Sequence, residues 1–414
     1  MTSFDMSGRV YDTVVAGAGP AGIATALALH HVGASVALVG PAPQTTAQVR
    51  PETRTAALLT SSVDFLKRLG VWEELSAHAA PLTAVRIVDA YRSLFKSPDI
   101  VFSSHEVGLA AFGYNIANST LNEVLYARAK DVLPRIVPEL IETVRHDKGH
   151  VSLTMKNSAT LSTHLVAAAD GRRSQCRQAA DIETEDWRYD QAAIASSFRH
   201  SCPHGGVSSE LHREGGSITS VPTLDENTSS LVLVGSSAEV EALMELDDTA
   251  FAEMLQDRFD DTLGAISDAG PRASFPIAGL TAKQLASNRT ALIGEAAHVM
   301  APIGAQGLNL GLRDAAALAD CVADALRQGR DTGASHVLAQ YAEARKLDVL
   351  SRTVGVDLLG RALLSNLLPV QFARNAVLTG LNSFTPLKRL IMKAGLEPPM
   401  TLPRLMRPAD HLTA

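Results

Sequence analysis

The chain has 414 residues, of which 46% are hydrophobic and 20% are charged, and its formal net charge is −7. This length and composition fit a globular protein of about two to three domains with a sizeable core. The acidic balance excludes a general nucleic-acid binder. The three cysteines have neither paired nor metal-ligand spacing, so we expect no disulfide framework, no metal site and a reducing, cytoplasmic setting. The first residues carry no basic, apolar signal, which argues against secretion.

The first predicted unit is a strand, a glycine-rich turn, a helix and a second strand within residues 10–39. Its turn has the G-x-G-x-x-G pattern of dinucleotide-binding βαβ units. Gly17 permits the turn, Gly19 lets the backbone approach a pyrophosphate, and Gly22 allows the helix to pack closely on the strand. The predicted nucleotide-binding residues of this turn are Gly17, Ala18, Gly19, Pro20, Ala21 and Gly22.

One part of the dinucleotide-binding pattern is missing. An acidic residue usually ends the second strand and holds the ribose hydroxyls, but Gly40 and Pro41 stand at that place. We therefore expect another group, or water, to hold the ribose.

The middle of the chain alternates between helical and extended patterns. A polar loop at residues 50–54 comes first. We predict helices at 56–69, 118–129 and 250–259, strands at 85–88, 100–102, 165–169, 191–198, 217–221 and 230–235, and a hairpin at 150–163. The later strands predict a second, more antiparallel sheet. The chain returns to the first sheet from Arg289, which implies a discontinuous nucleotide-binding domain.

Residues 291–319 carry the most informative pattern, a short apolar strand, a Gly/Pro-rich loop and a helix that begins near Gln306 to Asn309. Pro302, Gly304 and Gly307 favour tight loop conformations. A helix start presents free backbone N–H groups and the positive end of a dipole. We therefore expect an anion, or a ring that becomes anionic during the reaction, in front of this helix.

The last 65 or so residues are rich in apolar helical patterns, at residues 349–364 and 372–390, with interspersed bases. From residue 345 onward the chain carries ten Lys/Arg and four Asp/Glu, so this part is +6 and the remainder is −13. One interpretation is a set of helices that cap the core. The alternative is a surface that meets anionic lipid with its bases and inserts apolar residues at the headgroup boundary.

Three motifs together resemble those of the class A flavoprotein monooxygenases, the para-hydroxybenzoate hydroxylase-like group. They are G-A-G-P-A-G at residues 17–22, A-D-G-x-x-S-x-x-R at 169–177, and G-E-A-A-H-x-x-x-P-x-G-A-Q-G-L-N-L-G at 294–311. Within this group the chain is most similar to the ubiquinone-biosynthesis hydroxylases. The stretches typical of them are Q-G-L-N-L-G-L-R-D from Gln306, R-T-A-A-L from Arg54, and Pro203-His204 with Glu210.

The resemblance implies that the chain binds FAD, with its pyrophosphate at the first glycine-rich turn. It places Arg54, Asn118 and Asp170 along the cofactor. Glu295 stands where the family has an aspartate that bonds the ribityl chain, and Leu308 and Asn309 would meet the pyrimidine edge of the flavin through backbone groups. The further cofactor-binding residues that it implies are Gly294, Pro302, Gly304, Gln306 and Gly307.

The resemblance also implies the reaction, in which NAD(P)H reduces FAD and one oxygen atom of O2 is transferred to an electron-rich ring. The sequence identifies no base that deprotonates a phenol. His298 is a candidate, but we favour a structural role for it in the loop, and we expect Pro302 to shape the pocket. His204 and Glu210 are expected on the substrate side, without a catalytic role.

Three functions fit these patterns. The first is hydroxylation of a polyprenylated phenol or quinol precursor of ubiquinone, with a possible membrane surface or biosynthetic complex as partner of the C-terminal segment. The second is hydroxylation of a small soluble aromatic or polycyclic compound. The third is a non-catalytic flavoprotein scaffold.

The expected fold is an α/β composite, a discontinuous Rossmann-like FAD-binding domain with an inserted, mostly antiparallel substrate domain. We assign residues 1–75, 116–180 and 271–345 to the FAD-binding domain and 76–115 and 181–270 to the substrate domain. A helical segment at 346–414 completes the chain. We expect the protein in the cytoplasm, where it could lie at the inner face of a membrane.

Overall fold

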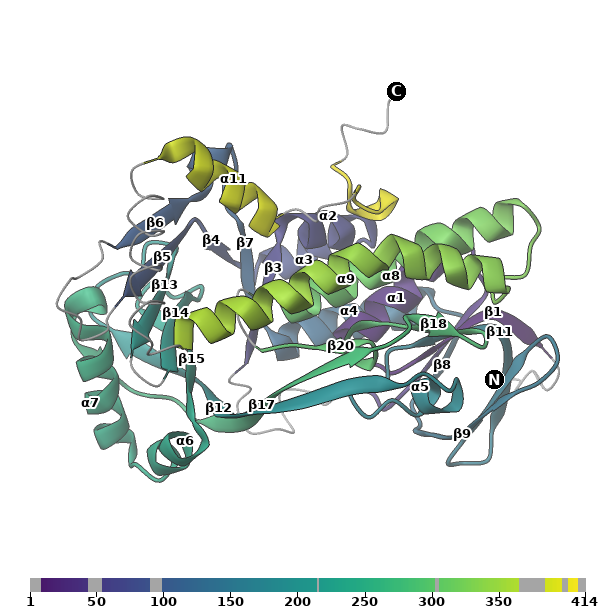
Figure 1. The fold of residues 1–414 in the computed structure, drawn as a ribbon, viewed down its shortest axis with the longest axis horizontal. Helices are drawn as coiled ribbons and strands as arrows, with labels where there is room; N and C mark the ends of the chain where they lie inside the picture. Colours follow the sequence, from purple (N-terminus) through teal and green to yellow (C-terminus); the bar gives the residue numbers. More distant parts are fainter. Residues whose placement is uncertain are drawn as a thin grey trace.

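The computed structural model describes residues 9–43, 54–89, 99–213, 216–301, 305–364, 384–396 and 401–408, and for residues 354–364 the backbone alone. Figure 1 shows two sheets at opposite ends of an elongated molecule, with the long helices α8 and α9 crossing between them. Of the helix predicted at 372–390, residues 372–383 lie outside the described part of the chain.

The first sheet has a parallel core in the order β19-β11-β1-β2-β8, as expected for a Rossmann-like domain. Strands β9 and β10 extend it through antiparallel pairing. The strands are β1 Val10–Ala16, β2 Val36–Val39, β8 Arg135–Val137, β9 Ile141–His146, β10 Val151–Met155, β11 Thr160–Ala168, β18 Ala286–Ser287 and β19 Thr290–Leu292.

The second sheet runs in the order β20-β17-β12-β15-β14-β13-β5-β6, with β16 on β12. Its strands are β5 Ala84–Asp89, β6 Ile100–Ser103, β12 Thr184–His200, β13 Val207–Arg213, β14 Gly216–Pro222, β15 Thr228–Ser236, β16 Ile266–Ser267, β17 Ala273–Ala282 and β20 His298–Val299. One face packs an apolar core against α6 (Ser237–Met244) and α7 (Asp248–Phe259). The predicted domain boundaries stay a prediction. Strand β17, which lies in the segment 271–345 assigned to the FAD-binding domain, pairs with β12 in this second sheet.

A three-stranded sheet, β3 (Thr55–Leu59), β7 (Gly113–Ala117) and β4 (Ala80–Leu82), lies between the two larger ones. The remaining helices are α1 Pro20–His31, α2 Thr60–Arg68, α3 Trp72–Ser76, α4 Asn118–Val132, α5 Gln175–Ala179, α8 Gln306–Arg327, α9 Ser335–Leu364 and α11 Thr385–Leu396. Short 3-10 turns are η1 Ser104–Val107, η2 Asp260–Leu263, η3 Gly294–Ala296 and η4 Arg404–Met406.

Two sequence predictions of secondary structure are wrong. The helix predicted at residues 56–69 begins only at Thr60, because residues 55–59 pair antiparallel with β7 and become a strand. The strand at 161–163 and the later one at 165–169 are one continuous strand, β11. Its residues 160–163 pair with β10, 162–168 pair with β1, and 166–168 pair with β19. In both places a distant partner strand decides the conformation, which local propensity cannot reveal.

The largest apolar core lies around the first sheet and is shared by α1, α2, α4 and α8. Helix α1 packs its alanines against α8, and both helices begin at the carboxyl edge of the parallel strands. In open α/β sheets ligands bind at this edge. Among the described helices, none is long and apolar enough to cross a membrane.

Candidate functional site

The first and second sequence motifs touch each other at the end of strand β1. A Cβ built at Gly17, where φ is +107°, would lie 2.1 Å from the carbonyl oxygen of Ala169, and a Cβ at Gly22 would lie 2.0 Å from the Gly17 oxygen. Only glycine permits this approach of turn, helix and neighbouring strand. The glycines at 17 and 22 therefore serve the fold of the turn itself.

Gly19 differs from these two glycines. Its φ of −78° suits any residue, and a Cβ added there would meet no described atom within 4 Å. It precedes Pro20, the first residue of α1, and no described side chain caps this helix start. The turn thus presents open backbone and the positive end of α1 on its outer side, which fits a pyrophosphate in close contact with the chain.

The third motif lies against the first through glycine. In α8, a Cβ on Gly311 would lie 3.2 Å from the Cα of Gly294 in η3 and 3.4 Å from the Cβ of Ala21 in α1. Arg177 of the second motif is buried and donates from Nη1 to the Ala296 carbonyl at 2.9 Å. The three motifs, more than 100 residues apart in the chain, therefore form one contiguous site.

Helix α8 begins as the sequence predicts, at Gln306. Ala305 precedes it in a left-handed conformation, with φ of +55°, and no described side chain caps the helix start. Gly307 is exposed and a Cβ there would meet no described atom within 4 Å, whereas Leu308 is half-buried. The predicted site residues Pro302 and Gly304 lie outside the described residues.

The side chain of Asn309 has a role that the sequence did not reveal. Its Nδ2 donates to the carbonyls of Ala57 (2.8 Å) and Ala305 (2.6 Å). Its Oδ1 accepts from the backbone N–H of Leu59 and the hydroxyl of Ser62, at 2.9 and 2.7 Å. Asn309 therefore clamps β3 and α2 to the start of α8, and only its backbone remains for the cofactor.

We expect Asn309→Ala to lower the free energy of unfolding by about 2–4 kcal/mol, because buried donors and acceptors on three elements lose their partner. FAD affinity should fall with it, since the start of α8 loses its attachment to β3. Urea unfolding of the apoprotein and fluorescence titration with FAD measure the two effects. Ser76→Ala is the control, since the Ser76 hydroxyl donates only to the local Glu73 carbonyl at the surface. An Asn309→Ala protein as stable as this control would contradict the clamp.

Arg54 and Asn118 lie next to each other, as their expected place along one cofactor requires. The Asn118 N–H donates to the Arg54 carbonyl at 3.1 Å, where β3 begins and β7 ends. Arg54 is exposed and Asn118 is half-buried at the first position of α4. The backbones of the two residues are therefore neighbours, although they lie 64 residues apart in the sequence.

The carboxylate of Asp170 has local partners. It accepts from the hydroxyl of Ser174 and, at 3.1 Å, from the backbone N–H of Cys176, so that it caps the start of α5. Glu295 in η3 is exposed, and its side chain is one methylene longer than the aspartate that the family has at this position. At the end of β2, a Cβ on Gly40 would lie 2.6 Å from the Ala18 nitrogen. The strand end packs on the turn too closely for an acidic side chain without a backbone shift.

His298, the candidate base, lies in the protein interior. It is 2% exposed, and its Nε2 lies 2.7 Å from Oδ2 of Asp314 in α8. The same Oδ2 accepts from the Gly294 N–H at 3.0 Å. Asp314 thereby joins η3, β20 and α8, which supports the structural role of His298 in the loop.

This arrangement continues into a buried ionic network. Oδ1 of Asp314 accepts from Arg345 Nε at 2.7 Å, and Asp348 accepts from both Arg345 and Arg313 at 2.8 Å. Burial alone would raise the pKa of Asp314, but attraction to His298 and Arg345 and the hydrogen bonds from His298 and Gly294 outweigh it and hold this pKa below its ordinary value. The network fixes α9 to the motif-bearing start of α8.

Of the two residues expected on the substrate side, His204 is structural. Its Nε2 lies 3.1 Å from the Thr223 carbonyl, and its Nδ1 accepts from the Gly206 N–H at 3.1 Å, so that it closes the turn before β13. Glu210 belongs to β13 and pairs with His212 in the same strand, with 3.0 Å between Oε1 and Nε2. No sequence pattern singles out His212.

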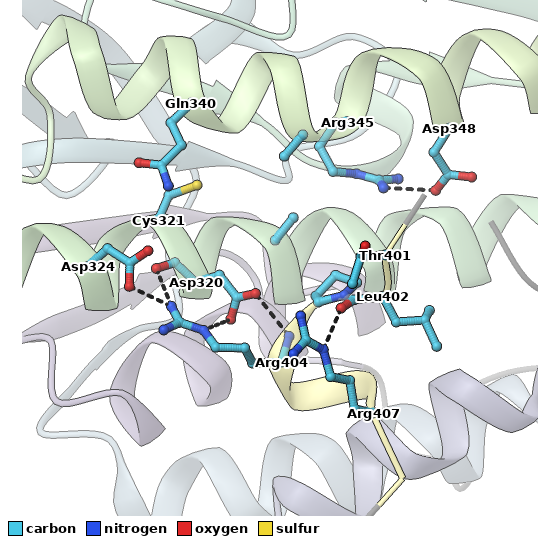
Figure 2. Close-up of a pocket in the computed structure, with 13 residues that line it drawn as sticks. Asp320, Cys321, Asp324, Gln340, Arg345, Asp348, Thr401, Leu402, Arg404 and Arg407 are labelled. Carbon is cyan, nitrogen blue, oxygen red and sulfur yellow. Dashed lines mark hydrogen bonds and ion pairs between the residues drawn. The ribbon is translucent and has the colours of Figure 1, made fainter. Parts of the chain in front are cut away.

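A cavity of about 310 Å³ lies elsewhere, between α8, α9 and residues 401–407. Figure 2 shows Arg404 bridging Asp320 and Asp324 of α8 at its floor, with Arg345 and Asp348 on the opposite wall. Asp320 is 14 residues into α8 from Gln306, about 20 Å along the helix. We interpret this cavity as the place where residues 401–407 dock on α8 and α9. The charged groups that line the cavity pair with each other, and Met406 is fully buried.

Comparison with known proteins agrees with this geometry. Residues 10–353 match the FAD binding domain family. The chain is 33% identical to ubiquinone hydroxylase UbiL of Rhodospirillum rubrum, over 96% of this chain and 93% of that protein. It is 30% identical to the 3-demethoxyubiquinol 3-hydroxylase of Escherichia coli, over 94% and 100%. Its fold resembles the crystal structure of p-nitrophenol 4-monooxygenase PnpA of Pseudomonas putida, with a TM-score of 0.76, 18% identity, and coverage of 95% and 99%.

The fold and the three converging motifs thus define an FAD-dependent monooxygenase. The chain belongs to the ubiquinone-biosynthesis hydroxylase family of the class A flavoprotein monooxygenases. FAD is its cofactor, and the expected α/β composite fold is confirmed. A non-catalytic scaffold, the third function considered above, is not supported by these relatives.

Proposed function

We propose that the chain hydroxylates the ring of a polyprenylated phenol or quinol intermediate of ubiquinone biosynthesis, with NAD(P)H and O2 as co-substrates. The convergence of the three motifs at the starts of α1 and α8 carries this proposal. The names of the relatives, which are ubiquinone and demethoxyubiquinol hydroxylases, support the substrate class.

The described residues that would hold FAD fall into three groups. The turn at residues 17–22 would receive the pyrophosphate on its open side at Gly19. Arg54, Asn118 and Glu295 would follow the ribityl chain and ring. Asp170 would contribute to FAD binding mainly by holding the start of α5 in place through its hydrogen bond from the Cys176 N–H. When bound, FAD supplies the oxygen chemistry, for which the protein provides position and an environment without water.

The start of α8 gives the site its electrostatic character. Its uncapped N–H groups at residues 306–309 make a fixed positive field that stabilises negative charge on a bound ring. Only one dinucleotide-binding fingerprint occurs in the sequence. We therefore infer that the nicotinamide donor binds transiently, without a Rossmann domain of its own.

The test uses purified protein that contains FAD, a prenylated phenol in detergent, NADH or NADPH, and isotopically labelled O2. A ring-hydroxylated product with one labelled oxygen atom is the expected result, identified by mass spectrometry. Consumption of NAD(P)H with only hydrogen peroxide formed, across prenylphenols and demethoxyquinols, would contradict the proposed function.

We also propose that α11 brings the enzyme to an anionic membrane surface, where such a substrate resides. Phe384, Leu387, Leu390 and Ile391 are 41–64% exposed on or just before this helix, and Arg389 and Lys393 are exposed beside them. Lys388 points the other way, pairing with Glu106 at 2.7 Å, and so fixes the helix to η1. Figure 1 shows α11 at the outer edge, above β6.

The double variant Leu390→Ser/Ile391→Ser should bind phosphatidylglycerol vesicles about tenfold or more weakly, because two exposed apolar side chains no longer enter the interface. Vesicle sedimentation measures this binding. Leu224→Ser is the matched control, since Leu224 is 56% exposed on a turn of the second sheet. Equal binding of both variants and the wild type would count against α11 as the contact.

A further inference from the structure

The second sheet has a further face opposite the one that α6 and α7 cover. Leu211, Ile218, Leu233 and Ile194 pair across four strands and belong to the covered core. Neighbouring residues along a strand point to opposite faces. The paired row that follows, His212, Ser217, Val234 and Ala193, therefore lies on the opposite face, where all of these residues but Ser217 are buried.

One end of this opposite face is apolar and adjoins the third motif. Ala193, Val234 and Ile277 form a small cluster against which Ala301 packs, and Ala301 follows β20 in the motif-bearing loop. The opposite end is polar, where Glu210 and His212 of β13 lie. His212 is three strands from Ala193, about 14 Å across the sheet. An aromatic ring with its substituents can span this distance.

His212 is buried without the hydrogen bonds that a structural histidine makes. It is 4% exposed, and among the described residues neither of its ring nitrogens has a hydrogen-bond partner, although Nε2 is 3.0 Å from Glu210 Oε1. His200, in the same sheet, contrasts with it, because its two nitrogens lie 2.8 and 2.9 Å from the Cys202 carbonyl and the Ser229 hydroxyl. Buried polar atoms without partners are uncommon, and a histidine with two of them can receive a ligand or a water.

We propose that Glu210 and His212 bind the ring hydroxyl of the substrate and accept its proton. The proposal rests on the phenol or quinol substrate class proposed above. The O–H bond breaks, the proton moves to a ring nitrogen of His212, and the electron pair stays on the oxygen. The phenolate then donates charge into the ring, which favours attack by an electrophilic oxygen. The Glu210 carboxylate stabilises the imidazolium that forms.

The charges around His212 favour this role. Glu210 precedes it by two residues on the same face, and Asp89 of β5 is its register partner on the other side. From β14 the neutral Ser217 faces it. Arg213, the next residue, points to the covered face, where its Nη2 donates to the Arg258 carbonyl. In the described part of the chain, the groups beside His212 are thus anionic or neutral.

The first test measures the protonation state of a bound phenol with the FAD-loaded enzyme and 4-nitrophenol as the probe. Its phenolate absorbs visible light and its phenol form does not, so a difference spectrum reports ionisation directly. In the wild type we expect the pKa of bound 4-nitrophenol to lie about one unit or more below that of the free compound. In His212→Phe this shift should disappear. A wild type without the shift, or a variant that keeps it, would overturn the proposal.

The second test follows turnover of 2-geranylphenol in detergent over a range of pH. His212→Phe should lower kcat about 100-fold near neutral pH with little change in KM, and the rate should recover at alkaline pH as the phenol ionises by itself. Glu210→Gln should move the acid limb of the kcat/KM profile to lower pH, because His212 loses a stabilising charge. Ser208→Ala, on the same face of β13 with its hydroxyl bonded to the Ser220 carbonyl, is the control.

The outcomes separate the two proposals. A wild type that hydroxylates 2-geranylphenol, together with a His212→Phe variant of unchanged kcat and acid limb, would overturn the proton acceptor alone. A wild type that binds 4-nitrophenol as phenolate but hydroxylates no prenylphenol would overturn the substrate class and leave the acceptor supported. Thermal unfolding and FAD content of each variant show whether the fold is intact, and Glu210→Gln gives an independent readout if His212→Phe does not fold.

Discussion

Gly19→Val is expected to abolish FAD binding while leaving the apoprotein as stable as the wild type. The φ of −78° at this position suits valine, and the space that a Cβ would enter is open in the described structure. That same space lies in front of the α1 start, where the pyrophosphate would approach the backbone. We expect FAD affinity to fall 100-fold or more, measured by fluorescence titration, with a colourless protein after purification.

Gly17→Ala is the informative contrast. With φ at +107° and a Cβ 2.1 Å from the Ala169 oxygen, alanine would push apart the turn and the end of β11. This variant should lose stability even without FAD, by several kcal/mol. If Gly19→Val destabilised the apoprotein as much as Gly17→Ala, the open side of the turn would not be the pyrophosphate site.

This contrast also shows what a sequence can and cannot predict here. The pattern of glycines identifies the βαβ turn because each glycine answers a local steric requirement that recurs in nucleotide-binding folds. It does not show that Gly17 and Gly22 serve the fold whereas Gly19 leaves space for a ligand. That distinction depends on Ala169, which lies 152 residues further along the chain from Gly17.

The contacts that the sequence did not reveal all join distant segments. Residues 55–59 read as part of a helix, but β7 recruits them as a strand, and the side chain of Asn309 then fixes that strand to α8. Similarly, His212 stands out only after pairing of β13 with β14 shows which face it occupies, whereas the family resemblance already singles out Glu210. Local pattern therefore predicts the glycine-rich turns of the fold, whereas contacts across a sheet depend on pairings that it does not show.

The buried ionic network gives the second large prediction. Arg345→Met should lower the free energy of unfolding by about 3–5 kcal/mol, because Asp314 and Asp348 lose a shared cation in an interior where water cannot replace it. Arg327→Met is the control, since Arg327 pairs with Asp324 at the surface and is 68% exposed, so its loss should cost less than about 1 kcal/mol. Urea unfolding of both apoproteins measures the difference.

The same network predicts how stability depends on pH. The folded-state pKa of Asp314 lies below its ordinary value, so the stabilisation is present above the pKa of the unfolded chain and is lost as the pH falls through the folded pKa. Asp314→Asn should remove this acid dependence, and the one amide oxygen of asparagine can accept from the Gly294 N–H or from Arg345 but not from both. Because Gly294 belongs to the motif that we propose to meet the flavin, FAD should dissociate from Arg345→Met and Asp314→Asn before the first sheet unfolds. If both variants lost FAD and global structure at the same urea concentration, the network would stabilise the whole fold and not the start of α8 in particular.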